Sequence, residues 1–363
     1  MKKVLVFGMT ENPGGVESVI MNYYRHFDRN NIKLDFLCNT EDVAYEDEII
    51  NMGGKIYKIT ARSKNYKKYK HEINTFFKNH AKEYNAIWVN ICSLANIDYL
   101  KYAKKYNIKK RIIHCHNSQN MDSFLRGLLH RFNKLSLKKY ATDFWTCSNE
   151  ASSWFYSDKI INSDKYLLIN NAIDCNKYAY NKKIREKIRK DLNLEDKIVF
   201  GNIGRLHFQK NQEFALKVFS EYLKINRNAV FLLVGDGEDK EKLKNICTQY
   251  NISDKVKFLG IRNDIPELLQ AMDIFLFPSL FEGFALSLIE AQASGIMIFT
   301  STNVKEEIKM SDSIYFMDLV NEEKWAKEIA KKYNNYNREK NKIYIKEKGF
   351  DIEENAKKIE KLF

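Results

Sequence analysis

Short apolar runs alternate along this chain with longer segments in which apolar residues recur every three or four positions. The short runs are typical of buried parallel strands, and the longer segments are typical of amphipathic helices. The expected strands of a first series are Val4–Phe7, Lys33–Leu37, Ile56–Ile59, Ala86–Val89, Lys110–His114, Asp143–Thr146 and Tyr166–Ile169. Those of a second series are Val199–Ile203, Val230–Val234, Val256–Leu259, Asp273–Phe277, Met297–Thr300 and Ser313–Phe316. The helices expected between the first strands are Val16–Phe27, Tyr66–Glu83, Ile97–Tyr106 and Leu125–Tyr140.

This order of elements predicts an α/β protein with two doubly wound parallel sheets, and 363 residues suit two domains of ordinary size. A charged segment without glycine or proline, residues 181–196, separates the two series. We therefore expect an N-terminal domain at residues 1–178 and a C-terminal domain at residues 179–344. A charged helix is expected within residues 340–363, with an apolar stripe at Ile352, Ala356, Ile359 and Phe363.

The chain carries 60 lysines and arginines against 47 aspartates and glutamates, a net charge of +13. Such a surplus favours anionic partners such as nucleic acid, lipid headgroups or phosphorylated substrates. The segment Lys64–Lys70 interleaves lysine with tyrosine. Three interpretations stay open, in decreasing weight: an ordinary solvated surface, a patch facing an anionic membrane, and a nucleic-acid surface.

Neither a membrane span nor a metal site is indicated. No apolar stretch approaches the ~18 residues that span a bilayer, and the apolar run at the start is too short for a signal peptide. We therefore expect a cytoplasmic protein. The six cysteines lack the spacing of zinc sites, and Cys115 is expected to be a small buried strand residue. No cluster of aspartates suggests a metal, so no metal or other cofactor is expected.

Two carboxylates follow the expected strand at residues 273–277. Glu282 stands in a loop before Gly283, and Glu290 stands in the helix expected from about Ala285. Backbone N–H groups at a helix N-terminus attract anions, so a phosphate can bind beside this loop. Two carboxylates beside a phosphate-binding backbone suit a nucleotide-activated ligand that carries hydroxyl groups.

Two further loops follow the first strand of each series. Gly14 and Gly15 precede the first helix, where glycine allows close approach of a ligand and positive φ. Gly204 is followed by Arg205 and Lys210, which are able to reach one diphosphate together. A plain turn and an ordinary basic surface loop are the respective alternatives.

Polar residues also end strands of the first domain. His114 and His116 stand at the carboxyl end of one expected strand, where α/β proteins bind ligands. His116 is nearer the loop, while His114 would lie deeper or on the other strand face. Asn90 and Ser148 end neighbouring strands and are also candidates for helix caps.

Together these loops carry a family resemblance over nearly the full length of the chain. The E-x7-E spacing of Glu282 and Glu290 resembles the signature of retaining glycosyltransferases of family 4, which have the GT-B fold. The Gly14-Gly15 pair and the Gly204-Arg205…Lys210-Asn211 element resemble the family's first-strand loops. The resemblance implies two Rossmann-like domains facing across a cleft, with a C-terminal helix at about residues 345–363 packing back on the first domain.

The resemblance also implies residue roles. Glu282 would bind donor-sugar hydroxyls and Glu290 the ribose hydroxyls. Arg205 and Lys210 would neutralise the leaving diphosphate, and His116 would contact the sugar near its reacting centre. The other donor-binding residues would be Gly14, Gly15, Gly204, Gly235, Arg262, Gly283, Phe284, Ala285, Leu286 and Ser287, and the acceptor-side residues would be Asn90, Asn117 and Ser118.

The expected function is transfer of a sugar, with retention, from a UDP-linked donor to a hydroxyl of a glycan or a lipid-linked oligosaccharide. The strand end Cys115–Ser118 is similar to that of members that build capsule, exopolysaccharide or lipopolysaccharide, at the inner membrane face. No nucleic-acid partner is expected. The alternatives are a non-hydrolysing sugar-nucleotide epimerase, which shares the two-sheet architecture, and a non-enzymatic basic module that binds membrane or nucleic acid.

Overall fold

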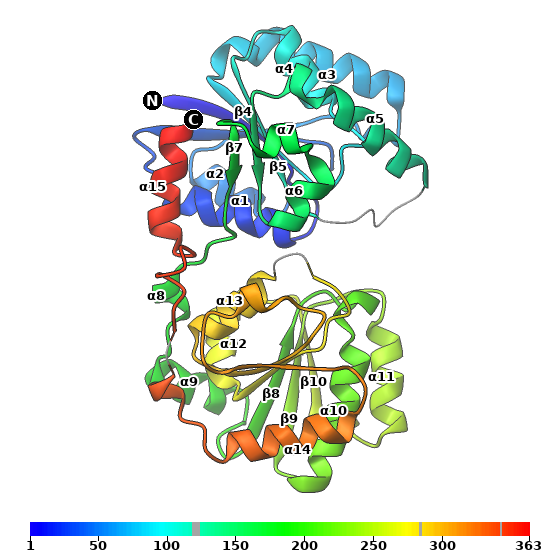
Figure 1. Ribbon diagram of the computed structural model, residues 1–363, viewed down its shortest axis with the longest axis vertical. Coiled ribbons are helices and arrows are strands. Elements are labelled where there is room, and N and C mark those ends of the chain that lie inside the picture. The colour runs from blue at the N-terminus through cyan, green and yellow to red at the C-terminus, as the bar shows by residue number, and fades with distance from the viewer. Residues whose placement is uncertain (118–123, 283–284, 342) are drawn as a thin grey trace. The chain divides into compact units, whose positions relative to one another are not determined.

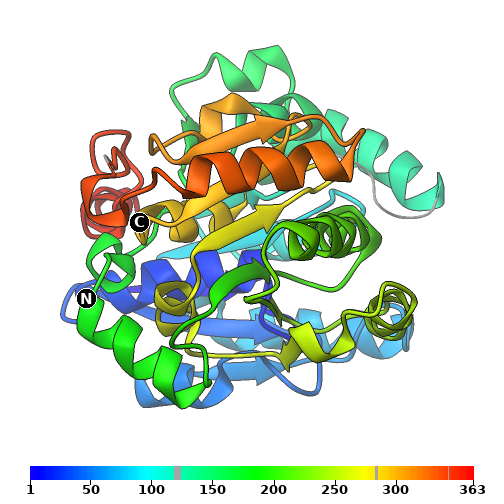
Figure 2. The same cartoon turned by 90° about the horizontal axis from the view of Figure 1, so that it is seen from below.

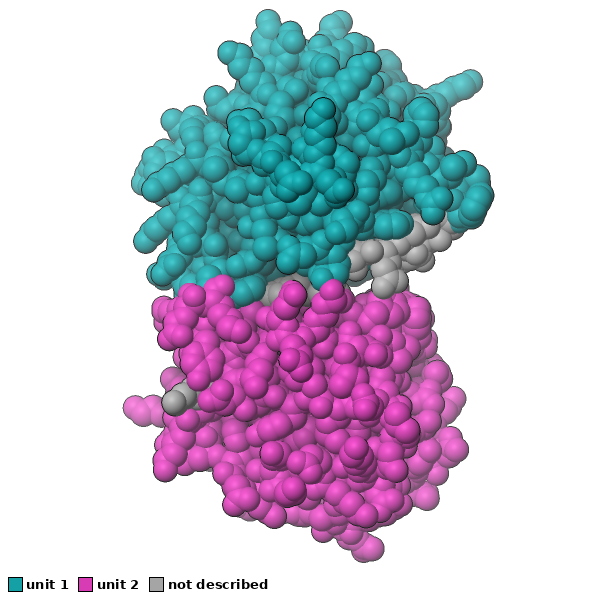
Figure 3. All heavy atoms as spheres, viewed as in Figure 1, with its two compact units in different colours: residues 1–172, 349–363 teal, residues 173–348 magenta. Residues whose placement is uncertain are grey.

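A computed structural model of the chain describes residues 1–117, 124–282, 285–341 and 343–363 (Figures 1 and 2). They form two compact units, coloured separately in Figure 3: residues 1–172 with 349–363 (unit 1) and residues 173–348 (unit 2). Unit 2 begins before the expected residue 179 because α8 (Cys175–Tyr178) packs against α12 (Ile265–Ala271) and α13 (Leu286–Ala293). It ends after the expected residue 344, at Lys348, whose ammonium donates to the Lys309 carbonyl of the same unit at 2.6 Å.

The described part of unit 1 contains a seven-stranded parallel sheet in the order β3-β2-β1-β4-β5-β6-β7. Helices α3 to α6 share one core with Ile87 and Val89 and so cover one face of the sheet. On the other face α1 packs against α15, whose neighbour Phe363 contacts Trp88. The strands are β1 (Lys2–Phe7), β2 (Ile32–Cys38), β3 (Ile56–Lys58), β4 (Ala86–Ile91), β5 (Lys110–Cys115), β6 (Asp143–Thr146) and β7 (Tyr166–Leu168). The helices are α1 (Gly15–His26), α2 (Glu46–Asn51), α3 (Tyr66–His80), α4 (Asp98–Lys105), α5 (Phe124–Tyr140), α6 (Asn149–Phe155), α7 (Asp158–Ile161) and α15 (Ile352–Leu362).

The described part of unit 2 contains a six-stranded parallel sheet in the order β10-β9-β8-β11-β12-β13. Helices α10, α11 and α14 share one hydrophobic core on one face of this sheet. Helix α8 packs against α12 and α13, and α9 packs against α12. The strands are β8 (Ile198–Ile203), β9 (Ala229–Val234), β10 (Val256–Gly260), β11 (Ile274–Phe277), β12 (Met297–Ser301) and β13 (Ile314–Met317). The helices not yet given bounds are α9 (Lys182–Asp191), α10 (Gln212–Ile225), α11 (Lys240–Gln249) and α14 (Glu322–Tyr333).

Both sheets have the same doubly wound order, which confirms the predicted fold class. In each sheet the strand order reverses between the first and the fourth strand of the unit, β1 and β4 in unit 1 and β8 and β11 in unit 2. Ligands of open α/β sheets bind outside the carboxyl ends of the strands at this switch point. The loops after these four strands are therefore where each unit is built to bind a ligand.

The C-terminal segment differs from its predicted extent. A helix was expected within residues 340–363, but α15 begins only at Ile352. Gly349 adopts a φ of +77°, which breaks a helix, and the Asp351 side chain then caps α15 by accepting from the Glu354 N–H. The predicted apolar stripe at Ile352, Ala356, Ile359 and Phe363 is buried.

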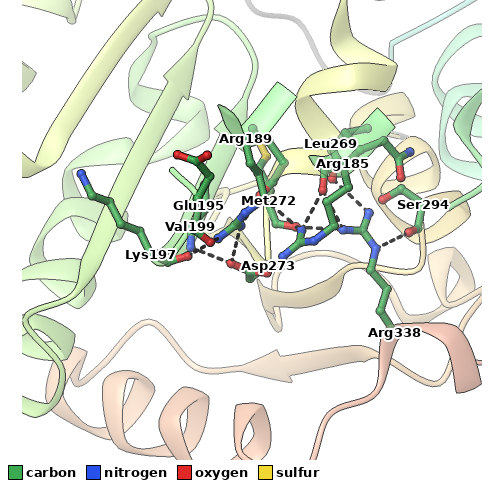
Figure 4. Close-up of polar contacts among 12 residues, drawn as sticks. Arg185, Arg189, Glu195, Lys197, Val199, Leu269, Met272, Asp273, Ser294 and Arg338 are labelled. Carbon is green, nitrogen blue, oxygen red and sulfur yellow. Dashed lines mark hydrogen bonds and ion pairs between the residues drawn. The ribbon is translucent and has the colours of Figure 1, made fainter. Parts of the chain in front are cut away.

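Three arginines gather around Asp273, which directly precedes β11 (Figure 4). Arg185 contacts its Oδ1 atom at 2.5 Å, and Arg189 contacts its Oδ2 atom at 3.1 Å. Arg338 donates to the carbonyls of Leu269, Gln270 and Met272, at the C-terminal end of α12. Cations are favourable beside the exposed carbonyls of a helix C-terminus. Burial lowers the pKa of Arg338 to about 10, so the side chain stays charged near neutral pH.

Candidate active site

The loops after β8 and β11 meet at the switch point of unit 2. Lys210, from the loop after β8, places its Nζ atom 2.7 Å from Oε1 of Glu282, in the loop after β11. The Ser279 hydroxyl donates to the same oxygen at 2.9 Å. The lysine ammonium also lies 4.8 Å from the centre of the Phe277 ring. The sequence-predicted Lys210 and Glu282 are thus adjacent, in a half-buried pair.

Contacts from the residues flanking Lys210 hold the two loops together. The Gln209 amide donates to the Phe281 carbonyl at 2.9 Å, and the Asn211 amide donates to the Pro278 carbonyl at 3.1 Å. In return the Leu280 N–H donates to the Gln209 carbonyl at 2.8 Å. These contacts position the ammonium and the carboxylate before any ligand binds, which lowers the cost of ordering them.

Glycine is required where the β9 loop approaches the β8 loop. Gly235 has a φ of +131°, and a Cβ there would lie 2.0 Å from the Gly204 carbonyl oxygen. A side chain at this position would therefore clash with backbone. At Gly204 a Cβ would contact only the Lys210 side chain, at 3.4 Å or more. Both glycines stand where they were predicted, in loops at the carboxyl ends of neighbouring strands.

Arg205 does not join the Lys210–Glu282 pair. Its guanidinium contacts Glu238 at 3.1 Å, and His207 contacts the other oxygen of the same carboxylate at 3.3 Å. The Arg205 side chain is 71% exposed, so little holds it in this position. A diphosphate at the strand ends would compete with Glu238 for this arginine.

Arg262 is engaged by its own loop. Its Nε and Nη2 atoms contact the two oxygens of Asp264 at 2.8 and 2.5 Å, a bidentate pair. The hydrogen bonds with Asp264 raise the pKa of Arg262 and engage its Nε and Nη2 atoms. The contact of this loop with the donor stays a prediction.

Helix α13 places Glu290 beside α8. Ala285 is the N-cap of the helix, Leu286 and Ser287 form its first turn, and Gly283 and Phe284 lie outside the described residues. The Tyr178 hydroxyl donates to Oε1 of Glu290 at 2.7 Å. Burial raises the pKa of Glu290, and the Tyr178 hydrogen bond opposes that rise by stabilising the carboxylate.

In unit 1 the glycine pair opens α1 as predicted, and neither glycine uses the positive φ that its lack of a side chain allows. Gly14 is the N-cap with a φ of −133°, and Gly15 is the first helical residue. A Cβ on Gly15 would meet no atom within 4 Å, and one on Gly14 would meet only the end of the Glu17 side chain. The strained glycine of this loop is Gly8, with a φ of +135°, where a Cβ would lie 2.6 Å from Cβ of Asn90.

Asn90 and His116 contact one another at the carboxyl edge of the unit 1 sheet. The Asn90 amide nitrogen donates to the Phe7 carbonyl at 3.3 Å, so its oxygen accepts from Nε2 of His116 at 3.0 Å. This arrangement assigns the His116 proton to Nε2. Asn117 is half-buried beside it, and Ser118 lies outside the described residues. Asn90 is thus not a helix cap, whereas Ser148 caps α6 by accepting from the Ala151 N–H.

His114 lies deeper in the same strand, as expected from strand alternation. It is fully buried, and its ring stacks on Trp88 with centroids 5.9 Å apart. Desolvation lowers the pKa of His114 well below its ordinary value, so this imidazole is neutral. Its position in the core makes His114 a structural residue.

Comparison with known proteins connects this geometry to a reaction class. A family model described as "Glycosyl transferases group 1" matches residues 184–358, most of which belong to unit 2. The putative glycosyltransferase EpsF of Bacillus subtilis (strain 168) is 27% identical over 313 residues, which are 85% of this chain and 81% of that protein. The UDP-Gal:alpha-D-GlcNAc-diphosphoundecaprenol alpha-1,3-galactosyltransferase of Escherichia coli is 34% identical over 181 residues, 48% of this chain and 46% of that one.

Solved structures show the same fold. Anabaena Alr3699/HepE, in complex with UDP and glucose, has a TM-score of 0.75 at 18% identity, covering 100% of this chain and 95% of that one. The chain is a glycosyltransferase with the GT-B fold. Its predicted donor-side loops are the ones that meet at the unit 2 switch point.

The basic segment Lys64–Lys70 of this glycosyltransferase is largely neutralised by its surroundings. Lys64 contacts Glu41 at 2.9 Å, Lys68 contacts Glu72 at 3.8 Å, and Lys70 contacts Asp98 at 3.5 Å. Tyr69 is fully buried in the core. Of the three interpretations left open by the sequence, these contacts favour the solvated surface.

Cys115 lies in the core of the glycosyltransferase, as predicted. Among the described residues, no group of three or more His, Cys, Asp or Glu side chains is arranged to hold a metal ion. Cys115 is fully buried, and desolvation raises the pKa of its thiol well above the ordinary value. A buried protonated thiol is a poor nucleophile and a poor ligand. No helix in the described ranges is both long enough and apolar enough to cross a bilayer.

Sequence reasoning missed several residues that complete the site of the glycosyltransferase. Tyr178 lies 112 positions from Glu290, so no local pattern links them. Glu238 follows the Gly235 turn, and the adjacency of β8 and β9 would have suggested its contact with Arg205. Ser279 is three residues before Glu282, the one missed contact with a local signal.

The glycosyltransferase is expected to lose stability in acid partly through His116. Burial lowers the pKa of His116 from 6.5 to about 3, so the unfolded chain binds this proton more tightly than the folded chain does. The stabilisation is fully present above about pH 6.5 and is lost as the pH falls toward 3. In His116→Gln, the free energy of unfolding should fall less steeply over this range, by up to about 1.4 kcal/mol per pH unit. Denaturant titrations between pH 7 and 4 measure the difference, and parallel curves would contradict the assignment.

Proposed function

We propose that the chain is a retaining hexosyltransferase of glycosyltransferase family 4 that takes a UDP-linked sugar as donor. Its acceptor would be a hydroxyl of a glycan or lipid-linked glycan, in capsule or related cell-surface polysaccharide synthesis at the cytoplasmic face of the membrane. Two relatives support this: the Escherichia coli galactosyltransferase above and a Campylobacter jejuni enzyme, 29% identical over 133 residues, are both named for diphospho-undecaprenol-linked acceptors. The fold neighbour HepE has also been solved with UDP-glucose.

The observation that carries the proposal is the pair of Lys210 and Glu282, joined at 2.7 Å where the loops after β8 and β11 meet. A carboxylate suits sugar hydroxyls, and an ammonium suits a diphosphate. With the sugar bound by Glu282 and the diphosphate bound by Lys210, the bond between the sugar and the phosphate would lie beside both side chains. Glu290, held by Tyr178, would bind the ribose hydroxyls, and Arg205 would move from Glu238 to the diphosphate.

In the proposed reaction the bond between the sugar C1 and the β-phosphate oxygen breaks while the acceptor oxygen bonds to C1 on the same face. The acceptor proton passes to the leaving phosphate, so the products are the glycoside and UDP. Charge that develops on the β-phosphate is stabilised by Lys210 and Arg205. The N-terminus of α13 favours the same charge.

His116 fits this mechanism as a neutral hydrogen-bonding group. With a pKa lowered to about 3 by burial, its imidazole holds no second proton to give at neutral pH. Its Nε2 atom is engaged by Asn90. We assign His116, Asn90, Asn117, Gly14 and Gly15 to the hydroxyls of the sugar or the acceptor, with no proton transfer by the protein.

Product analysis tests the proposal. The protein is incubated with UDP-glucose, UDP-galactose or UDP-N-acetylglucosamine and an undecaprenyl-diphosphate-linked sugar, and the anomeric proton of the product is observed by NMR. Retention predicts an α-linked product from an α-linked donor, and Arg205→Ala and Glu282→Ala should each lower transfer strongly. Arg227→Ala is the matched control, because Arg227 is exposed and precedes β9, away from the loops at the carboxyl ends of the strands.

Other outcomes separate the alternatives. A β-linked product would exclude retention. Near-normal transfer by both Arg205→Ala and Glu282→Ala would exclude the site. Conversion of the sugar nucleotide to an epimer without acceptor would favour an epimerase, and nucleic-acid binding with steep salt dependence and no sugar-nucleotide binding would favour a basic binding module.

A further inference from the structure

Helix α5 turns its apolar side away from the rest of unit 1. Phe132 is 69% exposed and Leu135 is 87% exposed. With successive residues 100° apart around a helix, the exposed apolar side chains form a stripe roughly 140° wide. The stripe consists of Phe124, Leu125, Leu128, Leu129, Phe132 and Leu135. The helix lies at the outside of its own unit (Figure 1).

Polar contacts hold the opposite side of α5 in place. The buried residues of the helix are His130, Asn133 and Leu137. His130 accepts from the Leu94 N–H at 3.1 Å and donates to the Trp154 carbonyl at 3.2 Å, and Asn133 donates to the Leu94 carbonyl at 2.7 Å. Desolvation lowers the pKa of His130, which keeps it neutral in these contacts. The usual arrangement, with the apolar side inward, is therefore reversed in this helix.

Basic residues border the apolar stripe. The sequence of α5 contains no aspartate or glutamate and five lysines and arginines: Arg126, Arg131, Lys134, Lys138 and Lys139. By helical periodicity Arg131, Lys134 and Lys138 follow one edge of the stripe. Lys134 and Lys138 also donate to backbone carbonyls of unit 1. Arg131 is exposed, and a basic edge beside an apolar stripe is typical of helices that lie in a membrane interface.

We propose that α5 is a membrane-binding helix, which lies in the headgroup region of an anionic bilayer with its apolar stripe inserted among the lipids. An exposed apolar stripe has no role in binding nucleic acid through phosphates, whereas a stripe bordered by cations matches an anionic lipid surface. The surface differs from the segment Lys64–Lys70, in which Lys64, Lys68 and Lys70 are paired with carboxylates. It does not depend on the proposed reaction, because lipid binding is measured without a sugar donor.

Vesicle flotation tests the proposal on the full chain. Wild-type protein should float with vesicles of equal parts phosphatidylglycerol and phosphatidylcholine and much less with pure phosphatidylcholine. The double substitution Phe132→Gln with Leu135→Gln should weaken partitioning on the order of tenfold or more, because both side chains are exposed and insert as a pair. The matched control is Ile225→Gln with Val320→Gln, which removes two exposed apolar side chains from unit 2.

Each other result overturns the proposal. Equal loss of binding in the control pair would show that exposed apolar area in general is responsible. Full binding by the α5 variant, with loss in Lys67→Gln and Lys68→Gln, would move the contact to α3. A wild-type dimer by light scattering that the α5 variant abolishes, without vesicle binding, would assign the stripe to a second copy of the chain. Circular dichroism and Tm, expected unchanged in the α5 variant, check that α5 stays folded.

Discussion

Replacing Lys210 with methionine is expected to lower kcat for sugar transfer by about 10²- to 10³-fold, with a smaller change in the donor KM. The ammonium is held 2.7 Å from Glu282 and over the Phe277 ring, so it is fixed where the leaving diphosphate would gain charge. Methionine keeps most of the side-chain length but removes the charge. Steady-state kinetics with a UDP-sugar donor measure the effect.

Two further variants make the Lys210 result specific. Lys217→Met removes the same charge from α10, where the lysine pairs with Glu213 at 2.9 Å, and should leave kcat within about twofold. The double variant Lys210→Met with Glu282→Gln should lose clearly less than the product of the single losses, because the two groups act in contact. Fully multiplicative losses, or a Lys210→Met enzyme with near-normal kcat, would contradict a shared role.

Replacing Asp273 with asparagine is expected to cost about 3–5 kcal/mol of the free energy of unfolding of unit 2. The carboxylate binds Arg185 and Arg189 and also accepts from the Val199 N–H at 2.8 Å. Its side chain is 8% exposed, so the pairs are shielded from water. Asparagine has nearly the same shape but leaves the buried Arg189 and the partly buried Arg185 without a counter-charge (Figure 4).

The matched control for Asp273→Asn is Asp196→Asn. It makes the same chemical change on an exposed residue and should alter stability by less than about 0.5 kcal/mol. Urea denaturation, followed by hydrogen exchange of the β8 and β11 amides, measures both variants in unit 2. An Asp273→Asn variant within about 1 kcal/mol of wild type would mean that the helix-end carbonyls alone stabilise the arginines.

The strands of both sheets were predictable because buried parallel strands are nearly continuous apolar runs. The predicted β4 and β12, at Ala86–Val89 and Met297–Thr300, differ from the observed Ala86–Ile91 and Met297–Ser301 only at their ends. The placement of Lys210 and Glu282 followed from position alone, since both stand just after strands that border a switch point. Their direct contact at 2.7 Å was not predicted.

The features that the sequence did not predict depend on contacts between residues far apart in the chain, or on which side of a helix packs against the core. The periodicity of α5 predicted a helix, but periodicity does not say which side packs inward, and His130 and Asn133 are the buried residues. The lysines of Lys64–Lys70 left three interpretations open, because the sequence does not show that Glu41, Glu72 and Asp98 lie beside them. The sequence also did not show that the glycine with positive φ in the first loop is Gly8, which packs against Asn90.

Hydrogen–deuterium exchange with and without UDP-glucose tests the assignment of the donor site most directly. Bound donor should slow exchange in the loop after β8, residues 204–211, and in the first turns of α13, residues 286–290, because these backbone groups would bind the diphosphate and ribose. Protection of these two segments is the predicted result. Saturating UDP-glucose that protects neither, or that protects only segments outside the loops after β8, β9, β10 and β11, would contradict it.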